Sequence, residues 1–184
     1  MGEYKGPEFY DKYLETHFEP YPEGKRLYQI AAELVCSRSG PVVDLGCGPG
    51  WFAQELERFK FNGRYTGIDF SEESIAEATR WRDSIHEFGT LFKYQFFWTD
   101  ITTLILDKSN GLYVCMDVLE HLQDDLAFIR QIPSGSDVLL TLPTYDSDAH
   151  VRWFTLTDDL CARYGVAGRQ VLHEREWFVT GVKL

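Results

Sequence analysis

The stretch VVDLGCGPGWF, residues 42–52, places a short apolar run directly before three glycines that are spaced two apart. The apolar run predicts a buried strand, and WFAQELERF, which begins at Trp51, predicts an amphipathic helix. Glycines between a strand and a helix let the backbone turn tightly and approach a ligand closely. This succession is typical of the first unit of a doubly wound parallel sheet, and it constrains the fold more than any other feature of the chain.

The alternation of strand and helix continues along the chain. Further strands are predicted for RYTGIDF, FKYQFFW, GLYVCMD and SDVLLTLP, and further helices for SEESIAEATRWRDSIHEF, capped by Ser71, and for residues 123–131. After a short helix that ends at Gly165, RQVLHE and REWFVTGVKL predict an antiparallel hairpin. We therefore expect an α/β fold with a doubly wound Rossmann-like sheet of seven strands, mostly parallel with an antiparallel C-terminal hairpin, and helices on both faces.

The chain length predicts a single domain. Its 184 residues fall within the usual size of one hydrophobic core. Two helices, over residues 8–18 and 25–36, come before the first strand, with a break at EPYPEG. We expect one domain over residues 1–184, made of an N-terminal helical cap segment (residues 1–36) and a Rossmann-like core (residues 40–184).

The chain carries an acidic balance of charge, with 18 Lys and Arg against 29 Asp and Glu and a formal net charge of −11 at pH 7. This charge should repel phosphate backbones and anionic membranes, so we expect neither a nucleic-acid nor a membrane partner. No stretch approaches ~18 consecutive apolar residues and no signal-peptide pattern is found, which favours a cytoplasmic protein. The four cysteines include no C-x-x-C pair, which favours reduced thiols over a disulfide.

An acid precedes the glycine loop. Asp44 lies two residues before Gly46, and the loop is G-x-G-x-G rather than the G-x-G-x-x-G of dinucleotide-binding proteins. A carboxylate would repel a pyrophosphate and attract an ammonium group, so the ligand should carry positive charge. Asp69 ends the second strand, where acids in such folds accept hydrogen bonds from a ribose. With Asp100 after the third strand, these acids suit a ligand that has an adenosine part and an amino-acid end.

Four motifs then occur in a fixed order: DLGCGPG, GIDFSEESI, the pair Asp100-Ile101, and MDVLEHL. Together they resemble the successive motifs of class I S-adenosylmethionine-dependent methyltransferases over roughly residues 40–145. Beyond them, LPTYDSDAHVRWF and ARYG resemble the tail of small bacterial and phage methyltransferase-domain proteins.

The resemblance implies S-adenosylmethionine as the cofactor and S-adenosylhomocysteine as its product, and it assigns residues to each part of the ligand. Tyr10 or Tyr13 would contact the donor carboxylate, because the first helix is expected near the cofactor. The other implied cofactor residues are Asp44 with the loop Gly46, Cys47, Gly48 and Gly50 for the methionine end, Asp69 for the ribose, Phe70, Asp100 and Ile101 for the adenine, and Asp117 and Val118 near the sulfonium. The alternative is a purely structural turn with ordinary acids at the strand ends.

Two histidines follow predicted strands on the ligand side of the sheet and are candidates for a catalytic base. His121 and His150 titrate near neutrality and could take a proton from an acceptor hydroxyl, although either could instead be bonded only to the backbone. Asp117, Glu120 and both histidines also resemble the metal-binding E-x-x-E-H of some ubiquinone-pathway and small-RNA terminal methyltransferases. The sequence D-V-L-E-H also occurs in relatives that use no metal, so a divalent metal is possible but not favoured, and no metal ligand is assigned.

The sequence thus predicts an enzyme that methylates a small-molecule acceptor, most simply on oxygen. An N-methyltransferase, a nicotinamide dehydrogenase and a non-catalytic S-adenosylmethionine-binding protein are the alternatives. Arg152, in the loop with His150, is expected to pair with Asp146 or Asp148 rather than with an acidic acceptor. The sequence assigns no oligomeric state.

Overall fold

A computed structural model of the chain describes residues 5–16, 22–85, 93–108 and 111–184, with only the backbone for residues 13–16 and 22–25. The described strands form one sheet of seven in the order β3-β2-β1-β4-β5-β7-β6. The pairs β1–β2, β2–β3 and β4–β5 are parallel and the pairs β5–β7 and β6–β7 are antiparallel, which confirms the predicted fold class. The chain divides into two compact units, an N-terminal unit of residues 6–101 and a C-terminal unit of residues 102–184 together with Lys5.

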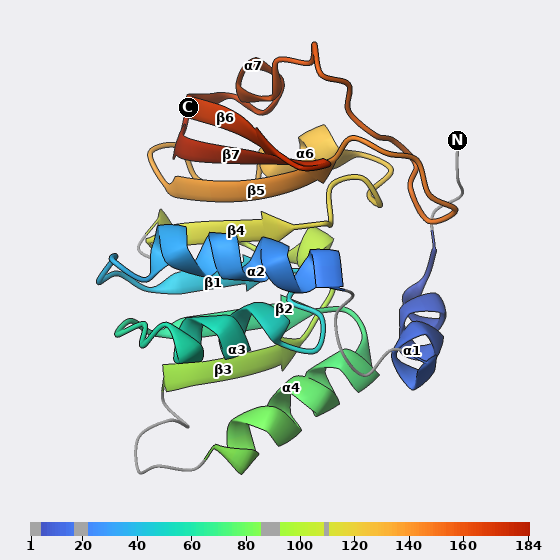
Figure 1. The fold of residues 1–184 in the computed structure, drawn as a ribbon, viewed down its shortest axis with the longest axis vertical. Helices are drawn as coiled ribbons and strands as arrows, with labels where there is room; N and C mark the ends of the chain where they lie inside the picture. The colour runs from blue at the N-terminus through green and yellow to red at the C-terminus, as the bar shows by residue number, and fades with distance from the viewer. Residues whose placement is uncertain (1–4, 17–21, 86–92, 109–110) are drawn as a thin grey trace. The chain divides into compact units, whose positions relative to one another are not determined.

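Within its described residues, the N-terminal unit contains three parallel strands and four helices, which Figure 1 labels. The strands pair as β3-β2-β1, with Val42 opposite Tyr65 and Tyr65 opposite Tyr94. Its elements are α1 (Pro7–Thr16), α2 (Pro22–Val35), β1 (Val42–Leu45), α3 (Trp51–Arg58), β2 (Tyr65–Asp69), α4 (Glu72–Ser84) and β3 (Tyr94–Trp98). All four β1 residues are buried, as expected for a strand inside a parallel sheet.

Local sequence accounts for where these helices begin. The side chain of Ser71 accepts a hydrogen bond from the Ser74 amide at 3.0 Å, and Glu72 and Glu73 follow in the first turn of α4, where acids favour the helix dipole. The predicted cap is therefore confirmed. The break at EPYPEG is wrong in part, because α2 already begins at Pro22. Proline suits the first position of a helix, since the amide hydrogen that it lacks would have no partner within the helix there.

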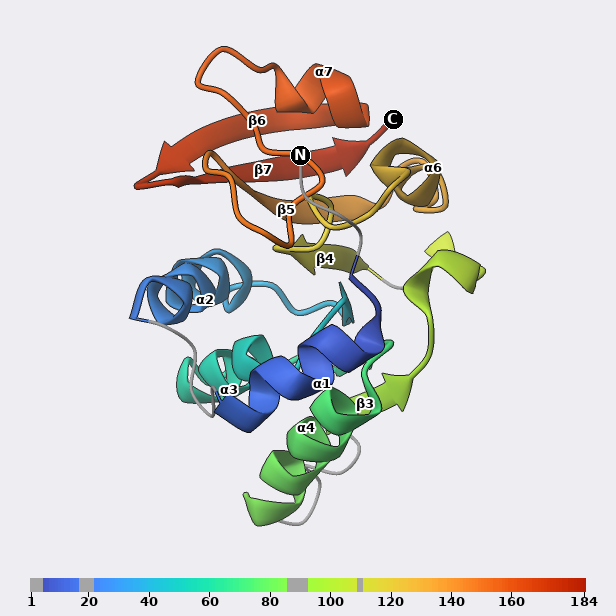
Figure 2. The ribbon, with the colours of Figure 1, turned by 90° about the vertical axis from the view of Figure 1, so that its right-hand side faces the viewer.

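Packing in the N-terminal unit involves contacts of the helices and a cluster of aromatic side chains. Helices α2 and α3 contact each other, α4 packs on β3 and β2, and α1 packs on α4 (Figure 2). The ring of Tyr65 lies 5.8 Å from both Tyr94 and Phe96, and Trp81 of α4 lies 5.3 Å from Tyr94. These aromatic contacts fix α4 against β2 and β3, at the first residues of the two strands.

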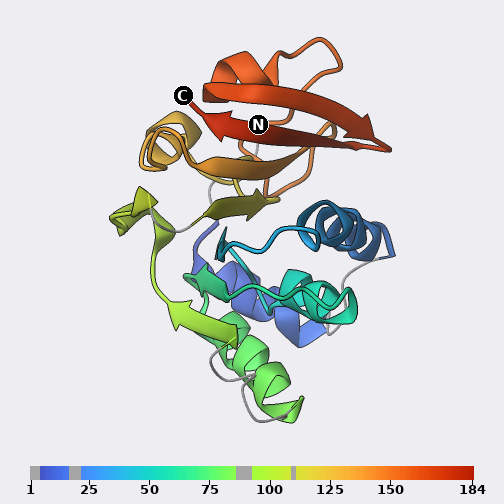
Figure 3. The same ribbon diagram turned by 90° about the vertical axis from the view of Figure 1, so that its left-hand side faces the viewer.

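The C-terminal unit contains the other four strands. Strands β4 and β5 are parallel, and β7 pairs antiparallel with both β5 and β6. The elements are η1 (Ile101–Thr103, which begins in the N-terminal unit), β4 (Leu112–Met116), α6 (Asp125–Ile129), β5 (Asp137–Pro143), α7 (Leu160–Tyr164), β6 (Val166–His173) and β7 (Glu176–Lys183). Helix α7 packs on the β6–β7 hairpin, as Figure 3 shows. No described helix is long and apolar enough to cross a membrane.

Gly165 separates α7 from the hairpin. Its φ and ψ of 61° and 52° place it in the left-handed region, which glycine adopts without strain and which ends a helix. Strand β6 begins directly afterwards at Val166, three residues before the predicted RQVLHE run. Val166 is buried but Ala167 and Gly168 are exposed, so the first residues of β6 show no alternating pattern in the sequence.

Candidate functional site

The predicted site residues lie in both units. The N-terminal unit contains the glycine-loop group, which is Asp44, Gly46, Cys47, Gly48, Gly50 and Asp69. The C-terminal unit contains the histidine group, which is Glu120, His121 and His150. The glycine loop joins β1 to α3. Gly46, Gly48 and Gly50 all have positive φ, at 85°, 51° and 81°. A Cβ atom on Gly50 would lie 3.1 Å from Cβ of Ala78 and 3.3 Å from the Phe96 ring, whereas one on Gly48 would meet nothing within 4 Å. The loop therefore needs glycine at residue 50 both for its backbone and for its packing.

Alanine at residue 50 should destabilise the protein more than alanine at residue 48. Both variants force a residue with a Cβ into the left-handed region, at about 1–2 kcal/mol each. Gly50→Ala adds an overpacked contact that costs about 1–3 kcal/mol. Urea unfolding should show the lower midpoint for Gly50→Ala, with Gly48→Ala as the matched control. Equal midpoints would contradict the packing argument.

Asp44 belongs to β1, directly before the glycine loop, and its side chain is buried, with 1% of its surface exposed. The hydroxyl of Tyr65 donates to its Oδ2 at 2.6 Å, while the buried Oδ1 has no hydrogen-bond partner among the described residues. Burial raises the pKa of Asp44 to about 7; the Tyr65 hydrogen bond lowers it, and the nearby charge of Asp69 raises it further. A buried carboxylate oxygen that lacks a partner is costly, and a cationic ligand group would satisfy it. This is the environment that a ligand ammonium would complete.

The raised pKa of Asp44 should make the ligand-free protein less stable as the pH rises. The ordinary pKa of the group is 3.8 and its folded-state pKa is about 7, so between these values the folded protein binds more protons than the unfolded chain. Stability then falls with rising pH. At ~1.4 kcal/mol per pKa unit, the wild-type protein should lose roughly 1–2 kcal/mol more between pH 5.5 and 8 than Asp44→Asn does. Urea unfolding at the two pH values measures this, and parallel losses in both proteins would contradict it.

Asp69 connects the loop to the start of α4. Its Oδ2 accepts a hydrogen bond from the Gly48 amide at 2.8 Å, and its Oδ1 accepts one from the Ser71 amide at 2.9 Å. Burial raises the pKa of this carboxyl above its ordinary value, and these backbone hydrogen bonds partly offset the effect. Each carboxylate oxygen has a second lone pair, so Asp69 can accept from ribose hydroxyls as well.

Helix α1 covers the residues that follow Asp69. The rings of Tyr10 and Phe70 lie 5.4 Å apart, and the hydroxyl of Ser71 donates to Oδ1 of Asp11 at 2.5 Å. The structure thus brings Tyr10 beside the residue predicted to lie along the adenine. The side chain of Tyr13, in the same helix, falls outside the described part of the structure.

The remaining predicted cofactor residues lie at the ends of β3 and β4. Asp100 is exposed after β3, and Ile101 is buried at the start of η1. Asp117 follows β4 with a positive φ of 53°, and Val118 after it is half-buried. The Thr141 hydroxyl donates to Oδ1 of Asp117 at 2.9 Å and accepts from its amide at 3.1 Å. Burial raises the pKa of Asp117 to about 6, despite the Thr141 bond.

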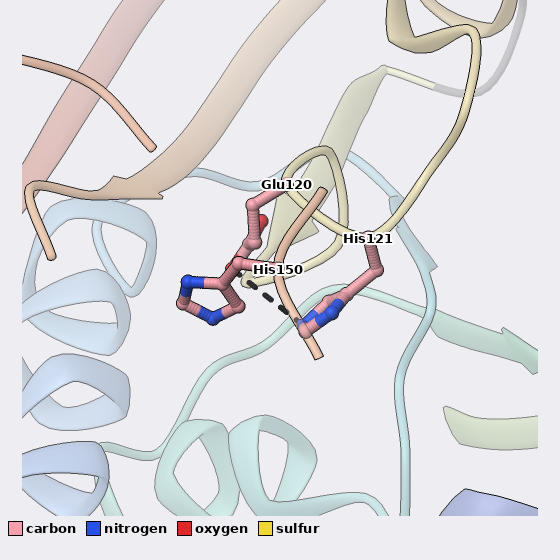
Figure 4. Close-up of side chains that lie close together, drawn as sticks. All are labelled: Glu120, His121 and His150. Atoms are coloured by element: carbon pink, nitrogen blue, oxygen red, sulfur yellow. Dashed lines mark ion pairs between the residues drawn. The ribbon is translucent and has the colours of Figure 1, made fainter. Parts of the chain in front are cut away.

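The histidine group is formed by Glu120, His121 and His150 (Figure 4). The rings of the two histidines lie 5.0 Å apart, and Nε2 of His121 lies 3.8 Å from Oε1 of Glu120. Glu120 and His150 are buried and His121 is half-buried. The chain thus brings together side chains from the segment after β4 and from the segment after β5.

Backbone carbonyls fix the tautomer of both histidines. Nδ1 of His121 bonds to the Ala149 oxygen at 2.9 Å, and Nδ1 of His150 bonds to the Tyr145 oxygen at 3.1 Å. A carbonyl can only accept, so each Nδ1 carries the proton and each Nε2 carries the basic lone pair. Burial lowers the pKa of His121 to about 4 and lowers that of His150, so both rings are neutral at pH 7.

Two further acids, Asp117 and Glu176, act on Glu120 of the histidine group. Oε2 of Glu120 is buried and has no hydrogen-bond partner among the described residues. Burial raises the pKa of Glu120 well above its ordinary value, and the charge of Asp117 adds to the rise. Glu176, at the start of β7, interacts with Asp117 and accepts a hydrogen bond from Tyr145; its pKa is raised to about 8, chiefly by burial. The sequence predictions missed Glu176 and Thr141, because no local pattern shows which residue of a neighbouring strand faces the site.

Arg152 has different partners from those predicted. It lies 3.6 Å from Oδ1 of Asp125, not against Asp146 or Asp148, and its guanidinium also donates to backbone carbonyls after β4. Asp125 is the buried first residue of α6 and a stronger partner than exposed acids in the arginine's own loop. The predicted ion pair is therefore wrong.

The donor atoms of the histidine group suit a divalent cation. One ligand atom from each of its three residues lies within 4.8 Å of the others. Neutral imidazoles with Nδ1 bonded to a carbonyl are the usual form of metal-binding histidine, and two imidazoles with one carboxylate suit first-row divalent metals. The buried Glu120 oxygen without a partner would also be satisfied by a cation. The residues present therefore fit such an ion.

Comparison with known proteins identifies the family of the chain and several proteins of similar sequence. A family model described as a methyltransferase domain matches residues 16–177. A ubiquinone biosynthesis O-methyltransferase of Rickettsia typhi is 29% identical over 106 residues, 55% of this chain and 40% of that protein. A protein-lysine N-methyltransferase of Saccharomyces cerevisiae is 49% identical over 49 residues, 23% of this chain and 21% of that protein. The chain spans less than half the length of these curated relatives.

Solved structures show the same fold. The crystal structure of magnesium protoporphyrin IX methyltransferase from Synechocystis PCC 6803 with bound SAM aligns with a TM-score of 0.66 at 16% sequence identity. The alignment covers 88% of this chain and 80% of that one. At this identity the similarity concerns the arrangement of the backbone.

Proposed function

The chain belongs to the family of methyltransferase domains, and on that premise we propose that it transfers the methyl group of S-adenosylmethionine to a hydroxyl of a small-molecule acceptor. The observation that carries the choice of oxygen is the pair of neutral imidazoles, His121 and His150, whose Nε2 atoms carry basic lone pairs. A hydroxyl acceptor benefits from such a base, because its oxygen must lose a proton as it is methylated.

The glycine-loop group would bind the cofactor. Asp44 offers a buried oxygen to the ammonium of the methionine end, and the turn at Gly46, Gly48 and Gly50 leaves room for its backbone to lie close to the ligand. Asp69 would accept from the ribose hydroxyls, and Phe70 and Tyr10 would lie near the adenine part. Cys47, Asp100, Ile101, Asp117, Val118 and Tyr13 complete the proposed cofactor residues.

The chain's own part in the chemistry is orientation and proton removal. When bound, S-adenosylmethionine supplies a methyl group on a positively charged sulfur. Nε2 of His121 or His150 would accept the hydroxyl proton, while the acceptor oxygen forms the new bond to the methyl carbon and the sulfur keeps the electrons of the broken bond. The carbonyls of Ala149 and Tyr145 hold the two rings and stabilise the imidazolium that forms.

A methyl-transfer assay tests this function. The protein would be incubated with S-adenosylmethionine that carries a labelled methyl group and with matched acceptors, phenols and catechols in one set and the corresponding anilines and benzylamines in the other. We expect label in the hydroxyl set. Label only in the amine set would support N-methylation instead, and cofactor binding without transfer to either set would support a non-catalytic binding protein.

A second candidate function is cation-assisted O-methylation, favoured by the unpartnered Oε2 of Glu120 beside two neutral histidines. Glu120, His121 and His150 would hold a first-row divalent ion, which when bound polarises a hydroxyl oxygen. The two roles exclude each other at a given nitrogen, because a lone pair that binds an ion accepts no proton.

Titration with Co²⁺ separates the two candidates without an activity measurement. With one equivalent of metal, a bound ion should give d–d absorption that is shifted and stronger than that of aqueous Co²⁺, and Glu120→Gln should give the spectrum of the aqueous ion. His173→Asn, a change of a β6 histidine outside the histidine group, is the matched control. A wild-type protein whose spectrum matches that of aqueous Co²⁺ would exclude the cation and leave the base mechanism.

A further inference from the structure

We infer that Arg152 is a positioning residue that holds the turn carrying Glu120 and His121 against the segment carrying His150. Its guanidinium donates through Nη1 to the Leu119 oxygen at 2.5 Å and to the Leu122 oxygen, and through Nη2 to the Gln123 oxygen at 2.9 Å. These three carbonyls lie on both sides of Glu120 and His121 in the chain. One side chain therefore satisfies three backbone carbonyls of this turn.

Two further bonds join the same pair of segments. The Val151 amide donates to the Glu120 oxygen at 2.9 Å, and Nδ1 of His121 donates to the Ala149 oxygen at 2.9 Å. Val151 thus sets the backbone position of Glu120, and Ala149 sets the tautomer of His121. The arginine extends this contact to Leu122 and Gln123, which neither of the other bonds reaches.

Arginine suits this task because its planar fork presents several donors in fixed directions. A lysine keeps the charge but has a single nitrogen, which cannot reach three carbonyls at once. Without the fork, the carbonyls of Leu119 and Leu122, whose bonds are partly buried, would lose their donor, and the turn would be held only by the two other bonds. The expected consequence is movement of His121 relative to Ala149, and with it loss of the fixed tautomer.

The ion pair with Asp125 is an alternative explanation for any effect of changing Arg152. It can be distinguished from the hydrogen bonds to the backbone carbonyls. Asp125 is 3% exposed and accepts from Nη2 of Arg163 and from the Tyr164 hydroxyl, each at 2.8 Å. The nitrogen of Arg152 is farther away, at 3.6 Å. Asp125 therefore keeps two close partners when Arg152 is changed. If Arg152 acted only through this carboxylate, changing Arg163 would have at least as large an effect.

The test compares Arg152→Lys with the matched control Arg163→Lys, both of which keep the charge and alter one partner of Asp125. Long-range ¹H–¹⁵N correlation spectra at pH 7 report the tautomers of His121 and His150. In the wild-type protein and in Arg163→Lys, both rings should show a protonated Nδ1. In Arg152→Lys, the two ¹⁵N shifts of His121 should converge, as for a mixture of tautomers. Unchanged His121 shifts in Arg152→Lys, or equal changes in both variants, would overturn the inference.

A second measurement covers the case in which Arg152→Lys does not fold. In the wild-type protein, the η protons of Arg152 should give separate signals that exchange slowly with water, because three of them are held by carbonyls. A single rapidly exchanging η signal would overturn the inference. Neither spectrum uses cofactor or acceptor, so a failure here is distinct from a failure of the proposed function. On that function, Arg152→Lys should lower kcat about 10–100-fold without changing the KM for S-adenosylmethionine.

Discussion

Replacing His121 and His150 together with asparagine should lower kcat for a hydroxyl acceptor by about 10²–10⁴-fold, the usual contribution of a placed base. Asparagine is chosen because its amide nitrogen can occupy the place of Nδ1 and still donate to the carbonyls of Ala149 and Tyr145. The basic Nε2 atoms are lost while the backbone bonds are kept. Initial rates at saturating S-adenosylmethionine measure the effect.

Two controls make this result specific. The affinity for S-adenosylmethionine should stay within about threefold of wild type by calorimetry, because neither histidine is proposed to touch the cofactor. His173→Asn should leave the rate unchanged. Full turnover of the hydroxyl acceptor by the double variant would contradict the role of both histidines as the base.

Asp44→Asn should weaken binding of S-adenosylmethionine by about 10–100-fold. Hydrogen bonds to charged groups contribute about 1.5–3 kcal/mol, and the variant removes the charge that is proposed to pair with the ligand ammonium. Asparagine has nearly the same shape, so the Tyr65 hydroxyl keeps an acceptor. Calorimetric titration at pH 7.5 gives the dissociation constants of both proteins.

A truncated ligand makes the Asp44 test sharper. Methylthioadenosine has the adenosine part but no amino-acid end, so Asp44→Asn should bind it as well as the wild-type protein does. Glu73→Gln, which removes an exposed acid in the first turn of α4, controls for the change in net charge. An equal loss of affinity for both ligands would mean that Asp44 supports the loop and does not contact the ammonium.

The sequence predicted the elements well wherever a single segment contains the signal. The strand before the glycine loop, the cap at Ser71 and the helix end at Gly165 depend on local chemistry, and all three are found in the structure. Pro22 was misplaced because proline marks both breaks and first helical positions. The start of β6 was missed because the residues after Val166 are exposed and show no alternation of buried and exposed side chains.

The candidate site was predictable only in part, because its polar partners come from distant segments. Asp44 and the two histidines stand out next to strand ends, but the bond from Tyr65 to Asp44 spans 21 residues and that from Thr141 to Asp117 spans 24. Glu176 belongs to the hairpin, where a charged residue would ordinarily be exposed to solvent, yet its charge acts on Glu120 of the histidine group. The mistaken partner of Arg152 has the same cause, since nearby acids in the sequence were preferred to a buried acid 27 residues away.

The two backbone bonds that Asp69 accepts have a consequence for how mutational data on this protein should be interpreted. The carboxylate links the amides of Gly48 and Ser71 through these two hydrogen bonds, without any ligand. A substitution at Asp69 would release the loop as well as remove an acceptor for the ribose. Any lost affinity would then mix reorganisation of the protein with a missing ligand contact, so a single change at this residue cannot apportion the two. Removing the ribose hydroxyls from the ligand would separate the two effects, because the hydrogen bonds from Gly48 and Ser71 to Asp69 stay in place.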